Sequence, residues 1–225
     1  MPIANQVLAA LSRADYKLLA PKLTLAPLPF GQVLYEPGDS VRHIYFPNDS
    51  LVSLLTLVDR HLALEVGMVG REGVVGIAFA LGVGSSPFRV LVQGGGSAMR
   101  MSAAAFRNEL ATSVGLQRAV NLYTHSLMTQ VATTAACNRF HEVEARLARW
   151  LLMTRDRLSA DAFRLTQEFL SHMLGTRRVG VTTAANALRR RKLIEYNRGH
   201  ISIINGRGLE AASCSCYRTM KSNCH

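Results

Sequence analysis

Long apolar runs are missing from the sequence. No stretch reaches the roughly 18 uninterrupted apolar residues typical of a membrane-spanning helix, and the N-terminus has no basic segment leading into an apolar one. We therefore expect a cytoplasmic protein with no membrane partner. With 48% hydrophobic and 18% charged residues, the 225-residue chain has the composition of a folded protein, built as one large or two small domains.

Cysteine is scarce and unevenly placed. Cys137 is followed only by Cys214, Cys216 and Cys224. This is not the even spread of a disulfide framework, so a reducing compartment is the simpler interpretation. With His225, the last three cysteines have the ligand types of a zinc or redox site, but their C-x-C-x7-C-H spacing fits no tight metal-binding knuckle. They are therefore only weak candidates for metal ligands. The alternative is that these residues form a frayed C-terminal tail, and the sequence assigns no metal.

Acidic residues are also scarce, at 15 against 26 lysines and arginines, which gives a formal net charge of +11. The excess is concentrated: 10 basic and 8 acidic residues precede Arg139, whereas 16 and 7 lie from there to the end. A basic binding module attached to a nearly neutral domain fits this distribution, and nucleic acid is the natural partner for such a module.

The first half of the chain has a sequence pattern typical of short β-strands. Between Phe30 and Met101, apolar runs are interrupted by Gly, Pro, Asp and Asn at spacings of roughly 8 to 12 residues. This pattern predicts an antiparallel sandwich or barrel, because each run ends in residues that favour turns.

A long helix is predicted after Ser102, where glycine and proline nearly vanish. Its apolar residues recur every three or four positions and form one stripe: Leu116, Val120, Tyr123, Leu127 and Val131. A small sandwich has little room to cover such a stripe, so we expect it to form a dimer interface. The alternative is that the stripe packs against the sandwich of its own chain.

Residues 165–194 have the pattern of a helix-turn-helix. Thr166 caps the first helix, and Gly175 permits a sharp turn into a second helix from about Arg177 to Arg190. The second helix directs mostly small apolar residues inward: Val181, Ala184, Ala185 and Leu188. Two β-prone runs around Asn197 and Gly199 then predict a hairpin, the wing of a winged helix.

The outer face of this second helix carries the candidate DNA contacts. Its side chains can reach base edges or phosphates in a major groove: Arg177, Arg178, Val179, Thr182, Thr183 and Asn186. The run RRRK at the end of the helix adds Arg190 and Lys192 as phosphate contacts. Taken alone, that run is equally typical of a solvated helix end, where cations suit the helix dipole.

Residues 165–205 resemble the winged helix of the Crp/Fnr family of bacterial transcription regulators. The segment GQVLYEPGDSVRHIYF, which starts at Gly31, is similar to the sensory sandwich of that family. The resemblance implies an α+β fold with an antiparallel β jelly-roll sandwich (residues 1–110), a long dimerisation helix (111–137) and a C-terminal winged helix-turn-helix (138–225). It also implies three partners: double-stranded DNA, a second copy of the chain and RNA polymerase.

The effector site implied by the resemblance departs from the family pattern. Cyclic-nucleotide binders of the family use a Gly-Glu pair and then Arg-Ser, whereas here Gly76 is followed by Ile77. Phe88 falls near the arginine position, and Arg89 comes one residue later, on the opposite face of a strand. Ser85 and Ser86 are weak phosphate-binding candidates beside the alternative of a polar loop. Cyclic AMP is therefore disfavoured, as is an iron–sulfur cluster, since no cysteine precedes Cys137.

The function predicted from the sequence is sequence-specific DNA binding by a homodimeric transcription regulator on a two-fold symmetric operator, without control by cyclic AMP. The alternative is a cyclic-nucleotide-domain interaction module that does not bind DNA. No nucleophile elbow, phosphate loop or H-E-x-x-H motif is present, so we do not expect an enzyme. The effector ligand stays unknown at this point.

Overall fold

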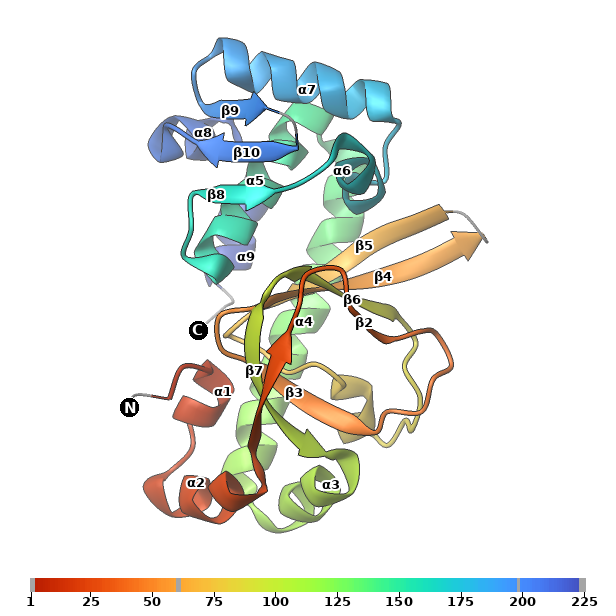
Figure 1. The fold of residues 1–225 in the computed structure, drawn as a ribbon, viewed down its shortest axis with the longest axis vertical. Helices are drawn as coiled ribbons and strands as arrows, with labels where there is room; N and C mark the ends of the chain where they lie inside the picture. Colours follow the sequence, from red (N-terminus) through yellow and green to blue (C-terminus); the bar gives the residue numbers. More distant parts are fainter. Residues whose placement is uncertain (1–2, 60–61, 198, 223–225) are drawn as a thin grey trace. The chain divides into compact units, whose positions relative to one another are not determined.

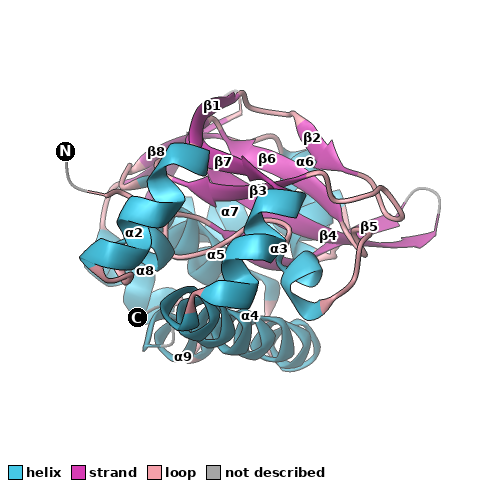
Figure 2. Ribbon diagram, turned by 90° about the horizontal axis from the view of Figure 1, so that it is seen from below, coloured by secondary structure: helices cyan, strands magenta, loops and turns pink. Residues whose placement is uncertain are grey.

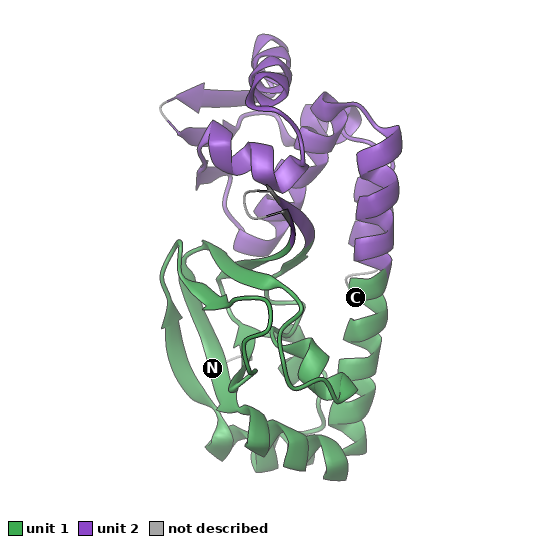
Figure 3. Cartoon of the chain, turned by 90° about the vertical axis from the view of Figure 1, so that its right-hand side faces the viewer, with its two compact units in different colours: residues 1–56, 67–128 green, residues 57–66, 129–225 purple. Residues whose placement is uncertain are grey.

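The computed structural model of the protein describes residues 3–59, 62–197 and 199–222. The chain divides into two compact units, which are coloured separately in Figure 3. Unit 1 comprises residues 1–56 and 67–128, and unit 2 comprises residues 57–66 and 129–225. Each unit is described by itself below, with the element labels of Figure 1.

Unit 1 is built on two antiparallel sheets, whose strands are magenta in Figure 2. One sheet has the order β1 (Thr24–Leu28), β7 (Gly96–Ser102) and β3 (His43–Pro47). The other has the order β2 (Val33–Tyr35), β6 (Arg89–Gly94), β4 (Leu51–Asp59) and β5 (Leu62–Val69), and residues 57–66 of its last two strands belong to unit 2. Buried side chains such as Ile44, Phe46 and Val92 form the core. The predicted antiparallel sandwich is confirmed.

Short helices surround this sandwich: α1 (Gln6–Ala9), α2 (Arg13–Leu19), η1 (Ala20–Lys22), η2 (Ile77–Leu81) and α3 (Ala103–Thr112). The buried Asn5 fastens α1 to the sandwich. Its side-chain oxygen accepts from the Leu8 N–H, while its amide donates to the carbonyls of Pro47 (3.0 Å) and Gly73 (2.9 Å). One buried amide therefore caps a helix and joins it to two distant segments.

The predicted long helix is α4 (Val114–Phe140). Most of the stripe expected to form a dimer interface is buried within the single chain. Four of its residues are buried, namely Leu116, Val120, Tyr123 and Leu127, and the fifth, Val131, is half-buried. A side chain at Gly73 would collide with the Tyr123 ring, because a Cβ there would lie 2.4 Å from the ring edge. The glycine leaves room for these four side chains to pack on their own sandwich, and the dimer seam stays a prediction.

Unit 2 contains the winged helix-turn-helix, so this prediction is confirmed. Its helices are α5 (Val143–Leu158), α6 (Gln167–Leu174), α7 (Arg178–Arg190), α8 (Gly206–Ala212) and α9 (Cys216–Ser222). A small antiparallel sheet has the order β8 (Ala162–Arg164), β10 (His200–Ile203) and β9 (Ile194–Asn197). α5 lies at the centre of the unit and contacts α6, α7, α8 and α9.

The β4–β5 hairpin also reaches α5 within unit 2. The indole N–H of Trp150 donates to Oε1 of Glu65 at 2.7 Å, and both side chains are buried. A buried carboxylate needs such a donor, because an unsatisfied one would be costly. Among the described helices, none is long and apolar enough to cross a membrane.

The packing of Tyr123 predicts the effect of filling the space at Gly73. Gly73→Ala should lower the free energy of unfolding by roughly 1–3 kcal/mol, because the added methyl group overpacks a buried ring contact. Gly84→Ala is the matched control, since a Cβ there meets nothing within 4 Å. Urea denaturation of both variants measures the difference, and equal stabilities would contradict the described packing of α4.

Candidate nucleic-acid interface

The turn of the helix-turn-helix is held by local hydrogen bonds. The Thr166 hydroxyl accepts from the Phe169 N–H at 3.1 Å and caps α6, as predicted. At the other end, Gly175 adopts a left-handed conformation (φ 54°, ψ 44°), and its N–H donates to the His172 carbonyl at 3.2 Å. Few residues other than glycine adopt this conformation without strain, so Gly175 ends α6 and sets the entry into α7.

The inner face of α7 is apolar and fully covered. The residues predicted to point inward are all buried: Val181, Ala184, Ala185 and Leu188. α7 contacts α5 and α6 through this side. Two alanines in the middle of the face permit a close approach of the helices, so the opposite face must lie outward.

The outer face of α7 presents most of the predicted DNA contacts to solvent. Exposed residues include Arg177, Arg178, Val179, Thr183, Arg190 and Lys192, whereas Thr182 and Asn186 are half-buried. Val179 is 71% exposed, which is unusual for a β-branched apolar residue. Thr182 differs from its neighbours, because its hydroxyl lies 3.0 Å from Gln167 Oε1 and also donates to the Arg178 carbonyl at 2.9 Å.

The basic residues at the end of α7 differ in whether an acidic side chain pairs with them. Arg191 forms an ion pair with Glu144, at 2.6 Å between Nη1 and Oε1, so its charge is partly neutralised. Lys192 is exposed and adopts a left-handed conformation, with φ of 57°. The Leu193 N–H then donates to the Leu188 carbonyl at 3.1 Å and closes the helix end.

The predicted wing is the hairpin of β9 and β10. His200 pairs with Asn197 and Ile203 pairs with Ile194, and Gly199 has the positive φ of 81° that such a turn requires. β8 extends the sheet on the other side of β10, with Ile201 opposite Phe163. Both of these side chains are buried, which fixes the base of the wing to the helices.

A known domain family matches this part of the sequence. Residues 145–212 match the Crp-like helix-turn-helix domain. The match begins in α5 and ends with α8, and therefore includes the whole helix-turn-helix and the wing.

Solved structures share the fold over nearly the whole chain. FixK2 of Bradyrhizobium japonicum has a TM-score of 0.72 at 14% identity, with 86% of this chain and 98% of that chain covered. A CRP-family transcriptional regulator of Thermus thermophilus has a TM-score of 0.70 at 18% identity, covering 84% and 96%. The c-di-GMP-responsive regulator CLP of Xanthomonas campestris has a TM-score of 0.67 at 16% identity, covering 85% and 99%. The Crp/Fnr-type fold is thus confirmed, while no curated protein sequence matches the chain.

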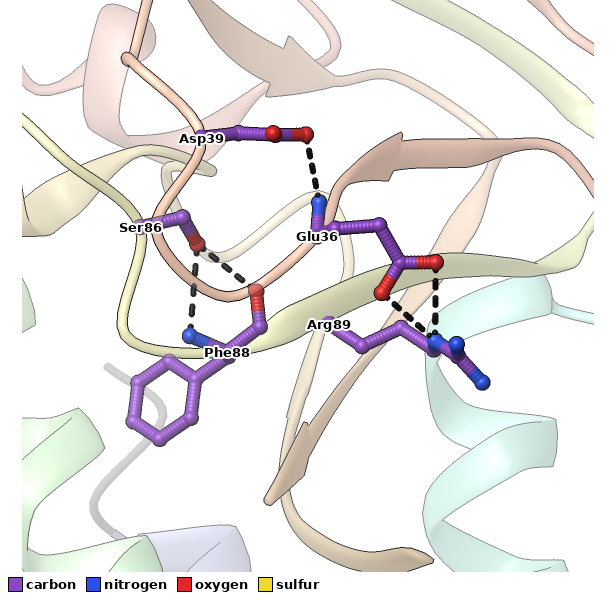
Figure 4. Close-up of polar contacts among 5 residues, drawn as sticks. All are labelled: Glu36, Asp39, Ser86, Phe88 and Arg89. Atoms are coloured by element: carbon purple, nitrogen blue, oxygen red, sulfur yellow. Dashed lines mark hydrogen bonds and ion pairs between the residues drawn. The ribbon is translucent and has the colours of Figure 1, made fainter. Parts of the chain in front are cut away.

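Figure 4 shows two residues of the predicted effector site of this Crp/Fnr-type fold, Ser86 and Arg89, together with Phe88 in unit 1. Gly76 is left-handed, with φ of 93°, and the half-buried Ile77 begins η2. Ser85 forms an isolated bridge with Ser40. The Ser86 hydroxyl donates to the Phe88 carbonyl at 2.8 Å and accepts from the Phe88 N–H at 3.3 Å. These bonds occupy the Ser86 hydroxyl within its own loop.

Arg89 is engaged with a neighbouring acid. Its Nε donates to both carboxylate oxygens of Glu36, at 2.8 and 3.1 Å (Figure 4). The hydrogen bond to Glu36 also raises the pKa of Arg89. Both members of this pair are partly exposed, so the ion pair itself contributes little stability. Its main effect is to direct the guanidinium toward Glu36.

The cysteines near the C-terminus have partners that the sequence did not indicate. Cys214 and Cys216 are buried beside Cys137, from the end of α4, and beside His141. Cys224 and His225, the other two candidates, lie outside the described residues. A hydrogen bond from Cys214 lowers the pKa of Cys137 to about 5. The C-x3-H spacing of Cys137 and His141 at a helix end is the one signal that could have drawn attention to them.

Proposed function

We propose that the protein is a sequence-specific, DNA-binding transcription regulator that acts as a homodimer on a two-fold symmetric operator. The observation that carries the proposal is the two-sided character of α7. Its apolar face is buried against α5, while arginines at both of its ends are exposed. A helix held in this way after a tight turn is suited to enter a major groove with its N-terminal residues first.

Base contacts would come from the start of α7. Arg178 is its first residue and is exposed, and an arginine in this position can donate two hydrogen bonds to a guanine. Val179 and Thr183 offer apolar contact to a thymine methyl group. Thr182 is less suited, because its hydroxyl already bonds Gln167 and the Arg178 carbonyl. We therefore assign base contact to Arg178, Val179 and Thr183.

Phosphate contacts would come from the other end of the helix. Arg190 and Lys192 are exposed, and such cations bind the backbone of any duplex regardless of sequence. Arg191 is excluded from this set by its ion pair with Glu144. Arg177, which precedes α7, and the half-buried Asn186 are further contacts of lesser weight.

The dimer would form through the face of α4 opposite the buried stripe. Leu122 and Met128 are 59% and 68% exposed, which is costly for two large apolar side chains on one helix. Further along the same helix, Ala132 and Ala136 are exposed and small enough for a second helix to approach closely. Two copies joined along α4 would present two recognition helices, as a two-fold symmetric operator requires.

Cyclic AMP is not part of this proposal. The guanidinium nearest the family's phosphate position, Arg89, bonds Glu36, and the Ser86 hydroxyl is used within its loop. A cyclic phosphate would have to break these contacts before it gained any. The effector is therefore a different molecule or signal. Contact with RNA polymerase stays a prediction from the family resemblance.

A module that binds only proteins is the competing function. It would use the sandwich and the exposed face of α4, but it leaves the exposed arginines of α7 without a role. Binding of duplex DNA separates the two functions directly.

Substitutions at the two ends of α7 should affect DNA binding differently. Arg178→Ala should relax the preference at one base pair per half-site by about 1–3 kcal/mol. Lys192→Gly should weaken all duplexes alike and lower the salt slope by about 1 per subunit, because a phosphate contact is lost. Glycine is chosen there because it accepts the left-handed backbone without strain.

Fluorescence anisotropy with a selected duplex and its single-base variants, over a range of salt concentrations, measures both effects. Arg13→Ala, an exposed arginine of α2, is the control and should change neither. The assignment of Arg178 fails if its variant loses affinity uniformly for every duplex. It would then be a phosphate contact.

Charge placed on the outer face of α4 should dissociate the dimer. Leu122→Glu puts two like charges into the proposed seam, so we expect a monomer at micromolar concentration in sedimentation velocity. Leu25→Glu is the matched control, because Leu25 is 68% exposed on β1. The proposed seam is contradicted if wild-type protein is itself monomeric, free and on DNA, or if Leu122→Glu remains a dimer.

Cyclic nucleotides should bind weakly or not at all. Isothermal titration of the full-length protein with cyclic AMP and cyclic GMP is expected to show no site tighter than about 10 μM, which corresponds to about −7 kcal/mol. A tighter site would mean that the contacts of Ser86 and Arg89 rearrange around the ligand.

A further inference from the structure

Three thiols and one imidazole from distant parts of the chain meet in unit 2. Cys137 lies near the end of α4 and His141 just after it, while Cys214 and Cys216 lie between α8 and the start of α9. Their ligand atoms all lie within 4.8 Å of one another. The Sγ atoms of Cys137 and Cys214 are 3.5 Å apart, and Sγ of Cys216 is 3.6 Å from Nδ1 of His141.

These separations match the edges of a small tetrahedron. A zinc ion with Zn–S bonds of about 2.3 Å and a Zn–N bond of about 2.0 Å separates two sulfur ligands by about 3.8 Å, and a sulfur from a nitrogen by about 3.5 Å. Two of the separations among the four atoms are therefore close to those around one zinc ion, and the others are no longer than 4.8 Å. An iron–sulfur cluster does not fit, because ligands on different irons of a cluster are kept farther apart than the 4.8 Å within which all four of these atoms lie.

A buried cation beside the cluster points to negative charge at this place. Arg149 is almost completely buried, and its Nη1 donates only to the sulfurs of Met153 (3.2 Å) and Met220 (3.3 Å). Its Nε has no hydrogen-bond partner, and no carboxylate pairs with it among the described residues. A buried, unpaired guanidinium is costly. A zinc ion with three thiolates and one neutral imidazole carries a single negative charge and would offset it.

We propose that Cys137, His141, Cys214 and Cys216 bind one zinc ion in a closed, structural site. Three thiolates and one imidazole form a ligand set that zinc uses in structural sites. Cys214 also lines a surface depression beside Ser213 and Ser215, which gives an ion a path to the site.

The position of the four ligands suggests what the ion does. The helix-turn-helix match covers residues 145–212, and two ligands precede it while the other two follow it. None of the four lies inside the matched residues. Zinc would tie the end of α4 to the segment after α8 and so close the two ends of the DNA-binding domain upon each other. This role does not depend on whether the domain binds DNA.

Metal content tests the proposal. Full-length protein purified without chelators should contain one zinc per chain by inductively coupled plasma mass spectrometry. Cys137→Ser and Cys216→Ser should lose it, whereas Cys224→Ser should retain it, since Cys224 is not among the four ligands. After removal of zinc, cobalt should restore the site and give the intense visible bands of tetrahedral coordination with thiolate charge transfer.

If the serine variants fail to fold, a second measurement on wild-type protein still tests the proposal. Removal of zinc by a chelator should lower the midpoint of thermal unfolding, and added zinc should restore it, because binding and folding are coupled. The proposal is overturned if wild-type protein holds no zinc and gives no tetrahedral cobalt spectrum. A Cys137–Cys214 disulfide mapped in metal-free protein, or loss of metal in Cys224→Ser alone, overturns it equally.

Discussion

Close packing between α7 and α5 determines which side chains of the C-terminal domain face outward. The inner face of α7 is made of Val181, Ala184, Ala185 and Leu188, and its small central residues let the helix lie near α5. Gly175 fixes the angle at which α7 leaves the turn. Once this face is buried, the helical period places Arg178 and Val179 in solvent. The chemistry offered to DNA is thus a consequence of apolar packing on the opposite side.

The arginines of this domain have two distinct physical roles. Those at the ends of α7 are exposed and suited to an anionic partner, whereas Arg146 and Arg149 are buried in α5. Burial lowers the pKa of Arg146, whose Nη2 donates to the Leu174 carbonyl. The high positive charge of the domain therefore does not all serve DNA binding. Part of it is buried near the thiols of the proposed zinc site.

The helix-turn-helix, the wing and the sandwich were predictable from the sequence because local signals determine them. Gly175, the cap at Thr166 and the spacing of small apolar residues each specify nearby backbone. The partner of the α4 stripe was not predictable, because amphipathic periodicity shows that a face is buried and not what covers it. The covering surface depends on Gly73, 50 residues before Tyr123. The meeting of Cys137 and His141 with Cys214 and Cys216 likewise depends on tertiary packing that spacing alone does not reveal.

We propose that two copies of α7 together recognise one specific duplex sequence. Repeated selection of bound fragments from a random duplex library by the full-length protein tests it most directly. We expect enrichment of an inverted repeat whose half-sites lie about one helical turn, or roughly 34 Å, apart. Binding without enrichment of any sequence, or no binding of duplex by folded protein even at low salt, would contradict it.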